Sequence, residues 1–83
     1  MTQLADLSQT IRESIKLYLG VELASDDQHF FAEAGVDSLA FLNVVSAIER
    51  KYAIKFSNEA LPDYDTCARL ARAASDLLER KGP

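Results

Sequence analysis

The sequence predicts an all-α protein, a small bundle of three main helices and one short helix with a long loop between helices 1 and 2. Apolar residues recur at three- and four-residue steps in three separate segments. Three glycines and two prolines are too few for an all-β chain that turns about every ten residues. A chain of 83 residues, 48% of them hydrophobic, suits one modest core. We therefore expect a single domain, 1–83.

The first helix is expected at about residues 3–19, and Gly20 is expected to end it, because glycine readily takes the left-handed conformation that follows a helix. Residues 20–36 lack a helical period, so they form a loop whose length indicates a functional role or anchoring by its own apolar side chains. Its expected anchors are Val21, Leu23 and Phe30. The apolar face of the first helix comprises Leu4, Leu7, Ile11, Ile15 and Tyr18.

The second helix is expected at about 37–52, beginning at Asp37 or Ser38, because aspartate caps free N–H groups at a helix start. At 100° per residue, one stripe of its wheel faces the core. Leu39, Leu42 and Ser46 fall outside that stripe, which favours contact with a partner over chance exposure. The core stripe comprises Phe41, Val44, Val45, Ile48 and Tyr52.

Two further helices complete the bundle. Residues 57–61 form one helical turn, which Pro62 is expected to end. Asp65 or Thr66 then caps a last helix at about 66–80. The inward face of that helix comprises Cys67, Leu70, Ala71, Ala74, Leu77 and Leu78.

The net charge of −4 argues against nucleic-acid binding, which depends on Lys and Arg at phosphates. Between Val21 and Glu49 there are six acidic residues and no Lys or Arg, so this stretch suggests basic partner surfaces, or else a solvated face. No apolar run is long enough to enter a membrane, and the first residues lack the features of a signal peptide. We expect a cytoplasmic monomer.

Few residues are candidates for catalysis. His29 has no sequence feature that pairs it with a nucleophile, so a solvated loop histidine is the favoured interpretation. Cys67 is the only cysteine and lies on an inward face, so it is expected to be a packed, structural residue. Asp26, Asp27 and Glu33 match no dedicated metal loop, and at most an adventitious cation site is expected there. The chain is therefore predicted not to be an enzyme, and no metal is expected.

The segment Gly35-Val36-Asp37-Ser38-Leu39 places a serine in the first turn of a helix. Asp37 can cap that helix, which leaves the Ser38 hydroxyl free, and a helix start favours a phosphate attached there. Phe30, Gly35, Asp37-Ser38-Leu39 and the long preceding loop resemble the acyl carrier proteins, a group that includes peptidyl carrier domains. The resemblance covers nearly the whole chain.

The resemblance implies that a phosphopantetheinyl transferase moves 4′-phosphopantetheine from coenzyme A to Ser38, with Asp37 as the neighbouring acid and Leu39 in the docking surface. The thiol of that group then carries acyl or aminoacyl groups as thioesters. The expected partners are this transferase, a loading ligase or synthase, and downstream transferases. The residues expected at the partner surface are Leu39, Leu42, Ser46 and Glu49.

The second helix is less acidic than in fatty-acid carriers, and Ser46 stands where those carriers often have methionine. This favours a free-standing carrier in a dedicated pathway over central fatty-acid synthesis. The cargo stays open among fatty acyl, polyketide and amino acid groups, the last loaded by an ATP-dependent ligase. The alternative from another class is a small helical interaction module without a prosthetic group.

Overall fold

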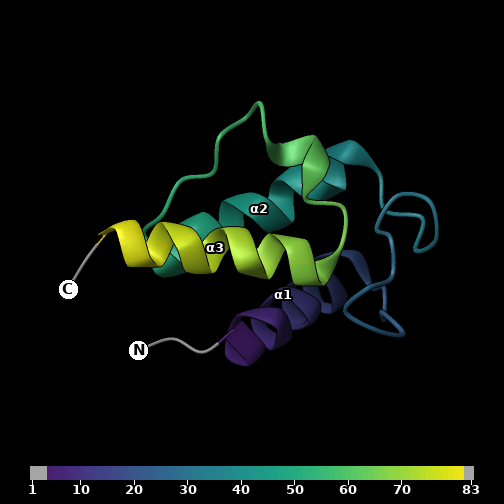
Figure 1. Cartoon of the computed structure of the whole chain (residues 1–83). Helices are drawn as coiled ribbons and strands as arrows, with labels where there is room; N and C mark the ends of the chain where they lie inside the picture. The colour runs from purple at the N-terminus through teal and green to yellow at the C-terminus, as the bar shows by residue number, and fades with distance from the viewer. Residues whose placement is uncertain (1–3, 82–83) are drawn as a thin grey trace.

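The computed structural model describes residues 4–81, and within them it contains three α-helices, one 3-10 helix and no strand. In the view of Figure 1, α1 lies below α2 and α3. α1 contacts both other helices. The predicted all-α bundle is confirmed. Its elements are α1 (Leu4–Leu19), α2 (Ser38–Tyr52), η1 (Leu61–Asp63) and α3 (Cys67–Lys81).

α1 contributes three fully buried residues to the core, Leu7, Ile11 and Ile15. Gly20 ends the helix as expected, with φ at +68° and its N–H donating to the carbonyl of Lys16 at 3.0 Å. Position 3, where we expected the helix to begin, lies outside the described residues.

α2 and α3 bury the stripes that their sequences predict. Phe41, Val44, Val45 and Ile48 of α2 are buried, and Tyr52 packs against the core while its hydroxyl donates to Thr10 Oγ1 at 3.1 Å. In α3, Cys67, Leu70, Ala71 and Ala74 are fully buried, whereas Leu77 and Leu78 are half-buried. Of the two cap candidates, Thr66 caps α3, because its Oγ1 accepts the N–H of Arg69 at 3.2 Å.

The helix expected at 57–61 is wrong in position. Ser57 to Ala60 form a turn, in which the N–H of Ala60 donates to the carbonyl of Ser57 at 3.1 Å. The 3-10 helix follows at Leu61–Asp63, with Pro62 in its first turn. Proline has no N–H, and the N–H groups in the first turn of a helix have no partner within the helix, so Pro62 fits the first turn of this helix instead of ending one.

The loop at 20–36 is held against the helices by side chains and backbone. Leu23 and Phe30 are buried, and Val21 packs against the core, so the three expected anchors are confirmed. Val36 is also buried, which the sequence analysis did not expect. Arg12 Nη2 donates to the Leu23 carbonyl at 3.0 Å. These contacts order the segment that leads into α2.

Candidate functional site

Ser38 is the first residue of α2, and its side chain is exposed. The cap is Asp37, whose extended backbone (φ −88°, ψ 166°) lets Oδ1 accept the N–H of Ala40 at 2.8 Å. Gly35, with φ at +73°, turns the chain just before this junction. The predicted division of roles is therefore confirmed, since Asp37 caps the helix and the Ser38 hydroxyl faces solvent.

A groove of about 570 Å³ lies beside Ser38, between the end of the long loop, the first turns of α2, and η1. We call it the Ser38 groove. Most of its lining is apolar, and Ser38 is one of its lining residues. An exposed hydroxyl next to an open apolar groove fits a flexible arm attached to that serine. The lining residues are Phe31, Ser38, Phe41, Leu42, Asn58, Leu61 and Pro62.

Aromatic rings form one wall of the Ser38 groove. The ring of Phe31 meets the ring of Phe41 edge-on, with centroids 5.3 Å apart. Phe30 lies behind them, fully buried, with its centroid 5.7 Å from that of Phe41. Edge-to-face pairs of this kind stabilise a fixed ring arrangement beyond the burial of apolar area. The loop therefore contributes a defined wall to the groove.

The two leucines that follow Ser38 are exposed as expected. The exposed fraction is 77% for Leu39 and 44% for Leu42. Ser46 is also exposed, about one turn beyond Leu42 along α2. The prediction that these three residues lie off the core is confirmed, and they form an exposed strip that starts beside the serine.

Glu49, grouped with that strip by sequence, has a structural contact that the sequence analysis missed. Its Oε2 accepts the N–H of Phe56 at 2.8 Å, and its side chain is half-buried. Phe56 is buried, so this bond holds the segment after α2 against the bundle. Its role at a partner surface stays a prediction.

His29 is not the solvated loop residue that we expected. Its Nδ1 accepts the N–H groups of Phe31 at 3.1 Å and Ala32 at 2.9 Å. Its Nε2 lies 3.1 Å from Asp65 Oδ2. The expectation failed because Asp65 is 36 residues away in the chain, and composition gives no sign of that pairing.

Cys67 is fully buried, and its thiol donates to the Ser8 carbonyl with an Sγ–O distance of 3.1 Å. Burial, reinforced by the charge of Asp26, raises the pKa of the Cys67 thiol to about 12. A thiol with such a pKa is almost wholly protonated near neutrality, so it is a poor nucleophile. Within residues 4–81 no three His, Cys, Asp or Glu side chains gather where they would hold a metal ion.

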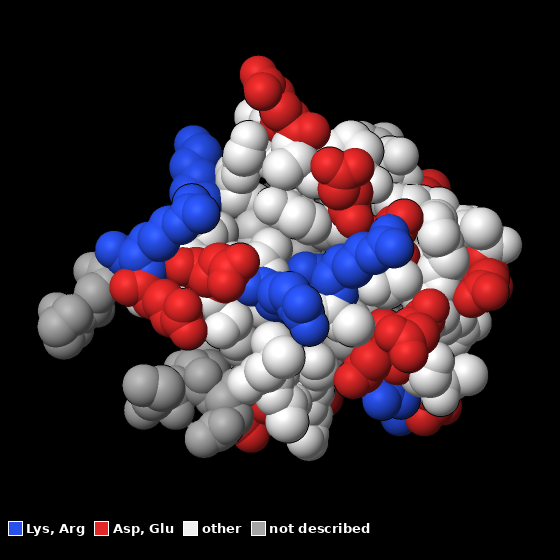
Figure 2. Space-filling model, viewed as in Figure 1, with Lys and Arg blue, Asp and Glu red and all other residues white. Residues whose placement is uncertain are grey.

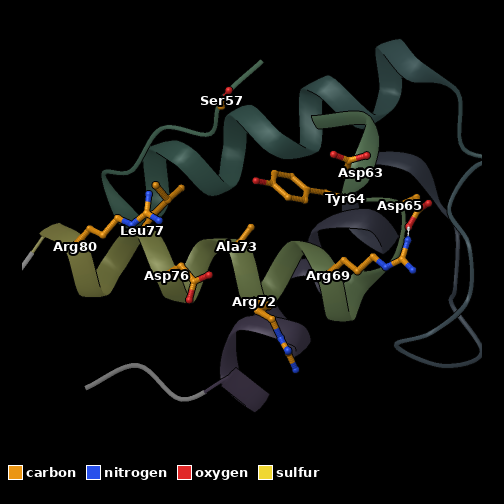
Figure 3. A pocket seen from close by; sticks show the side chains of 10 residues that line it. All are labelled: Ser57, Asp63, Tyr64, Asp65, Arg69, Arg72, Ala73, Asp76, Leu77 and Arg80. Atoms are coloured by element: carbon orange, nitrogen blue, oxygen red, sulfur yellow. Dashed lines mark hydrogen bonds and ion pairs between the residues drawn. The ribbon is translucent and has the colours of Figure 1, made fainter. Parts of the chain in front are cut away.

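A second groove, of about 520 Å³, runs along the outer side of α3 (Figure 3). We call it the α3 groove. From α3 it is lined by charged side chains that include Arg69, Arg72 and Asp76. Figure 2 shows Lys and Arg side chains over the middle of this face and towards the C-terminal end of α3. Its lining residues are Ser57, Asp63, Tyr64, Asp65, Arg69, Arg72, Ala73, Asp76, Leu77 and Arg80.

Comparison with known proteins gives matches over most of the chain. Residues 9–74 match the family model described as the phosphopantetheine attachment site. The anthracycline acyl carrier proteins DauA of Streptomyces sp. (strain C5) and DpsG of Streptomyces peucetius are each 38% identical over 63 residues, covering 76% of this chain and 75% of the relative. The solution structure of oxytetracycline acyl carrier protein superposes with a TM-score of 0.66 at 30% identity, covering 100% of this chain and 88% of that one.

Across residues 4–81, none of the helices has the length and apolar character needed to cross a bilayer.

Proposed function

Because the chain belongs to the acyl carrier protein family, which carries 4′-phosphopantetheine covalently, we propose that Ser38 is the residue to which this group is attached. Ser38 lies inside the region that matches the family model. The observation that carries the proposal is the exposed Ser38 hydroxyl at the start of α2, left free because Asp37 is the cap.

The chain is a carrier protein that holds acyl groups for other enzymes. When attached, the phosphopantetheine group supplies a thiol that holds these acyl groups as thioesters. The start of α2 contributes partial positive charge and free N–H groups, which favour a phosphate on Ser38. The apolar walls of the Ser38 groove favour apolar parts of the arm and cargo over water.

The cargo that we propose is the acyl chain of a polyketide. The support is the similarity to carriers named for anthracycline and oxytetracycline, together with the weakly acidic α2 that sets this chain apart from fatty-acid carriers. No observation in the structure favours an aminoacyl cargo.

The partner enzymes in this proposal dock on the strip of Leu39, Leu42 and Ser46. The leucines are exposed apolar anchors, and the acidic residues of this proposed surface are Asp37 at the start of α2 and Glu49 further along it. Acyl carrier proteins work with phosphopantetheinyl transferases and synthases, and a basic surface on such an enzyme complements this region. A cytoplasmic location stays a prediction.

We further propose that the chain has no catalytic site of its own. The support is the state of its two best candidates for nucleophile and base. The Cys67 thiol is buried, and its pKa is raised to about 12. His29 uses Nδ1 to accept two backbone N–H groups, so this nitrogen has no lone pair left for a substrate proton.

Intact mass spectrometry tests the assignment of Ser38. The protein is incubated with coenzyme A and a promiscuous phosphopantetheinyl transferase. We expect the wild-type chain to gain one phosphopantetheine and the Ser38→Ala variant to gain none. Ser46→Ala is the matched control, because Ser46 is an exposed serine on the same helix. An unmodified wild-type chain, under conditions that load a known carrier, would contradict the proposal, and so would loading of Ser38→Ala.

A further inference from the structure

We propose that His29 is a positioning residue, which holds Phe31 in place as a wall of the Ser38 groove. The proposal rests on the proposed function in one respect only, namely that the Ser38 groove is where the arm and its cargo lie. It concerns a residue outside the motif that carries the serine.

The imidazole of His29 joins two parts of the chain. Its Nδ1 accepts the N–H groups of Phe31 and Ala32 at 3.1 and 2.9 Å. These two contacts assign the ring hydrogen to Nε2, because a nitrogen that accepts carries no hydrogen. Nε2 lies 3.1 Å from Asp65 Oδ2, within the distance of an ion pair. One side chain therefore ties the turn that carries Phe31 to the residue just before the α3 cap.

The backbone of His29 closes the same turn from the other side. Its N–H donates to Glu33 Oε2 at 2.9 Å. Its carbonyl accepts the N–H groups of Glu33 at 3.1 Å and Ala34 at 2.9 Å. This reciprocal arrangement resembles a capping box at the start of a helix. The turn from 29 to 34 is thus built around His29, with Phe31 inside it.

Asp65 is a firm anchor for this arrangement. Its carbonyl accepts the N–H of Phe30 at 2.8 Å, and its Oδ1 binds Arg69 Nη1 at 2.7 Å. Nearby, the N–H of Ala68 donates to the carbonyl of Asp26 at 3.0 Å. Figure 3 shows the dashed contact between Asp65 and Arg69 at the start of α3. Through Asp65, His29 connects the Phe31 turn to a helix of the core.

The position of Phe31 depends on this turn. Phe31 is only half-buried, so burial alone holds it less firmly than the fully buried Phe30. Its ring touches Phe41 edge-on at 5.3 Å and the His29 ring at 5.9 Å between centroids. Without an acceptor at Nδ1, the N–H groups of Phe31 and Ala32 lose their partner. The turn then loosens, and the Ser38 groove loses its outer wall.

The competing explanation is that His29 and Asp65 form an ordinary surface pair. Exposed pairs contribute little to stability, and Glu33 alone would then keep the turn closed. The two explanations differ in what the substitution His29→Ala does to Phe31. They also differ in whether His29→Asn restores the wild-type behaviour, because an asparagine side-chain oxygen accepts N–H groups two residues ahead.

The test compares His29→Ala and His29→Asn in the protein without phosphopantetheine, using nuclear magnetic resonance. In His29→Ala we expect the amides of Phe31 and Ala32 to exchange hydrogen about tenfold faster, as for a lost hydrogen bond. We also expect the cross-peaks between the rings of Phe31 and Phe41 to weaken. His29→Asn should restore most of both signals. The amide of Ala40, which Asp37 caps, is the internal control and should be unchanged.

An unchanged ring contact in His29→Ala overturns the proposal, and so does a His29→Asn protein that behaves like His29→Ala. Circular dichroism checks that both variants fold. After loading, we expect the Phe31 ring signals to shift in the wild type and to shift less in His29→Ala. If intact mass shows no loading at all, the proposed function fails, while the ring contact in the unloaded protein still decides the role of His29.

Discussion

The Ser38 groove and the α3 groove are nearly equal in volume, at about 570 and 520 Å³, but differ in chemistry. The Ser38 groove is lined mostly by phenyl and aliphatic side chains, with Ser38 and Asn58 as its polar lining residues. The α3 groove is lined by arginines and aspartates, and Arg69 is already paired with Asp65 at 2.7 Å. Volume therefore does not distinguish the two. The difference is that only the Ser38 groove combines apolar walls with a hydroxyl at a helix start.

The largest expected effect comes from one substitution in each groove, followed by measurement of transfer to a partner enzyme. These two variants test which groove takes part in that transfer. Leu42→Asp places a charge in the Ser38 groove and on the docking strip. We expect it to slow loading and transfer by about tenfold or more, as for loss of a central apolar anchor. Arg72→Ala removes a cation from the α3 groove, and we expect a change of less than about twofold.

Steady-state kinetics of loading and transfer, at low and high salt, provide the measurement for both variants. Circular dichroism confirms the fold, which exposed positions should preserve. A larger loss in Arg72→Ala than in Leu42→Asp would reverse the comparison and make the α3 groove the partner surface.

A third variant tests whether the only thiol of the chain belongs to either groove. Cys67 lies on the buried face of α3, opposite the α3 groove. Cys67→Ala should lower the free energy of unfolding by about 1 to 2 kcal/mol, because it leaves a small cavity and removes the bond to Ser8. Chemical denaturation measures this, and intact mass should show normal loading. Lost loading with a preserved fold would contradict a purely structural role.

The raised pKa of Cys67 gives this prediction a pH dependence. The unfolded thiol loses its proton near its ordinary value of 9.0, whereas the folded thiol keeps it up to about 12. Deprotonation then favours the unfolded chain, so the wild type loses stability relative to Cys67→Ala as the pH rises from 9 towards 12. Both proteins should also carry Ser38→Ala, so that no second thiol is present.

The smallest effect is expected at Glu49. Variants of this residue test whether the partner surface extends along α2 as far as Glu49. Glu49→Ala should lower the free energy of unfolding by about 1 kcal/mol, because the Phe56 N–H loses its acceptor. Glu49→Gln keeps an acceptor oxygen and should cost less. Thermal unfolding compares the two. If Glu49→Gln keeps its stability but slows transfer in a salt-sensitive way, Glu49 also contacts the partner.

The features that the sequence predicts correctly are local ones. A cap such as Asp37 and a stop such as Gly20 act on N–H groups and backbone angles within one turn, so neighbouring residues determine them. The same holds for the face on which Leu39 and Leu42 lie, since helical geometry sets it. The resemblance rests on this region, and it leads to the family that the comparisons establish.

The features that the sequence analysis missed involve contacts or choices that spacing does not encode. His29 and Asp65 meet only because the long loop folds back onto the start of α3. Glu49 reaches the N–H of Phe56 because Ala53 takes a left-handed conformation, with φ at +55°, and turns the chain back after α2. Pro62 suits both the end of one helix and the first turn of another, so composition leaves its place undecided.

Charges of opposite sign at the two ends of α2 give this helix an electric dipole. Asp37 stands at the start of α2 and Arg50 and Lys51 in its last turn, about 20 Å apart at the usual helical rise. A cationic enzyme surface exerts a torque on such a dipole and turns the serine end forward. Salt screens this field over about 8 Å at physiological strength, so the turning takes place in the last step of approach. If partners dock on the proposed strip, this field aligns the carrier before Leu39 or Leu42 touches the enzyme.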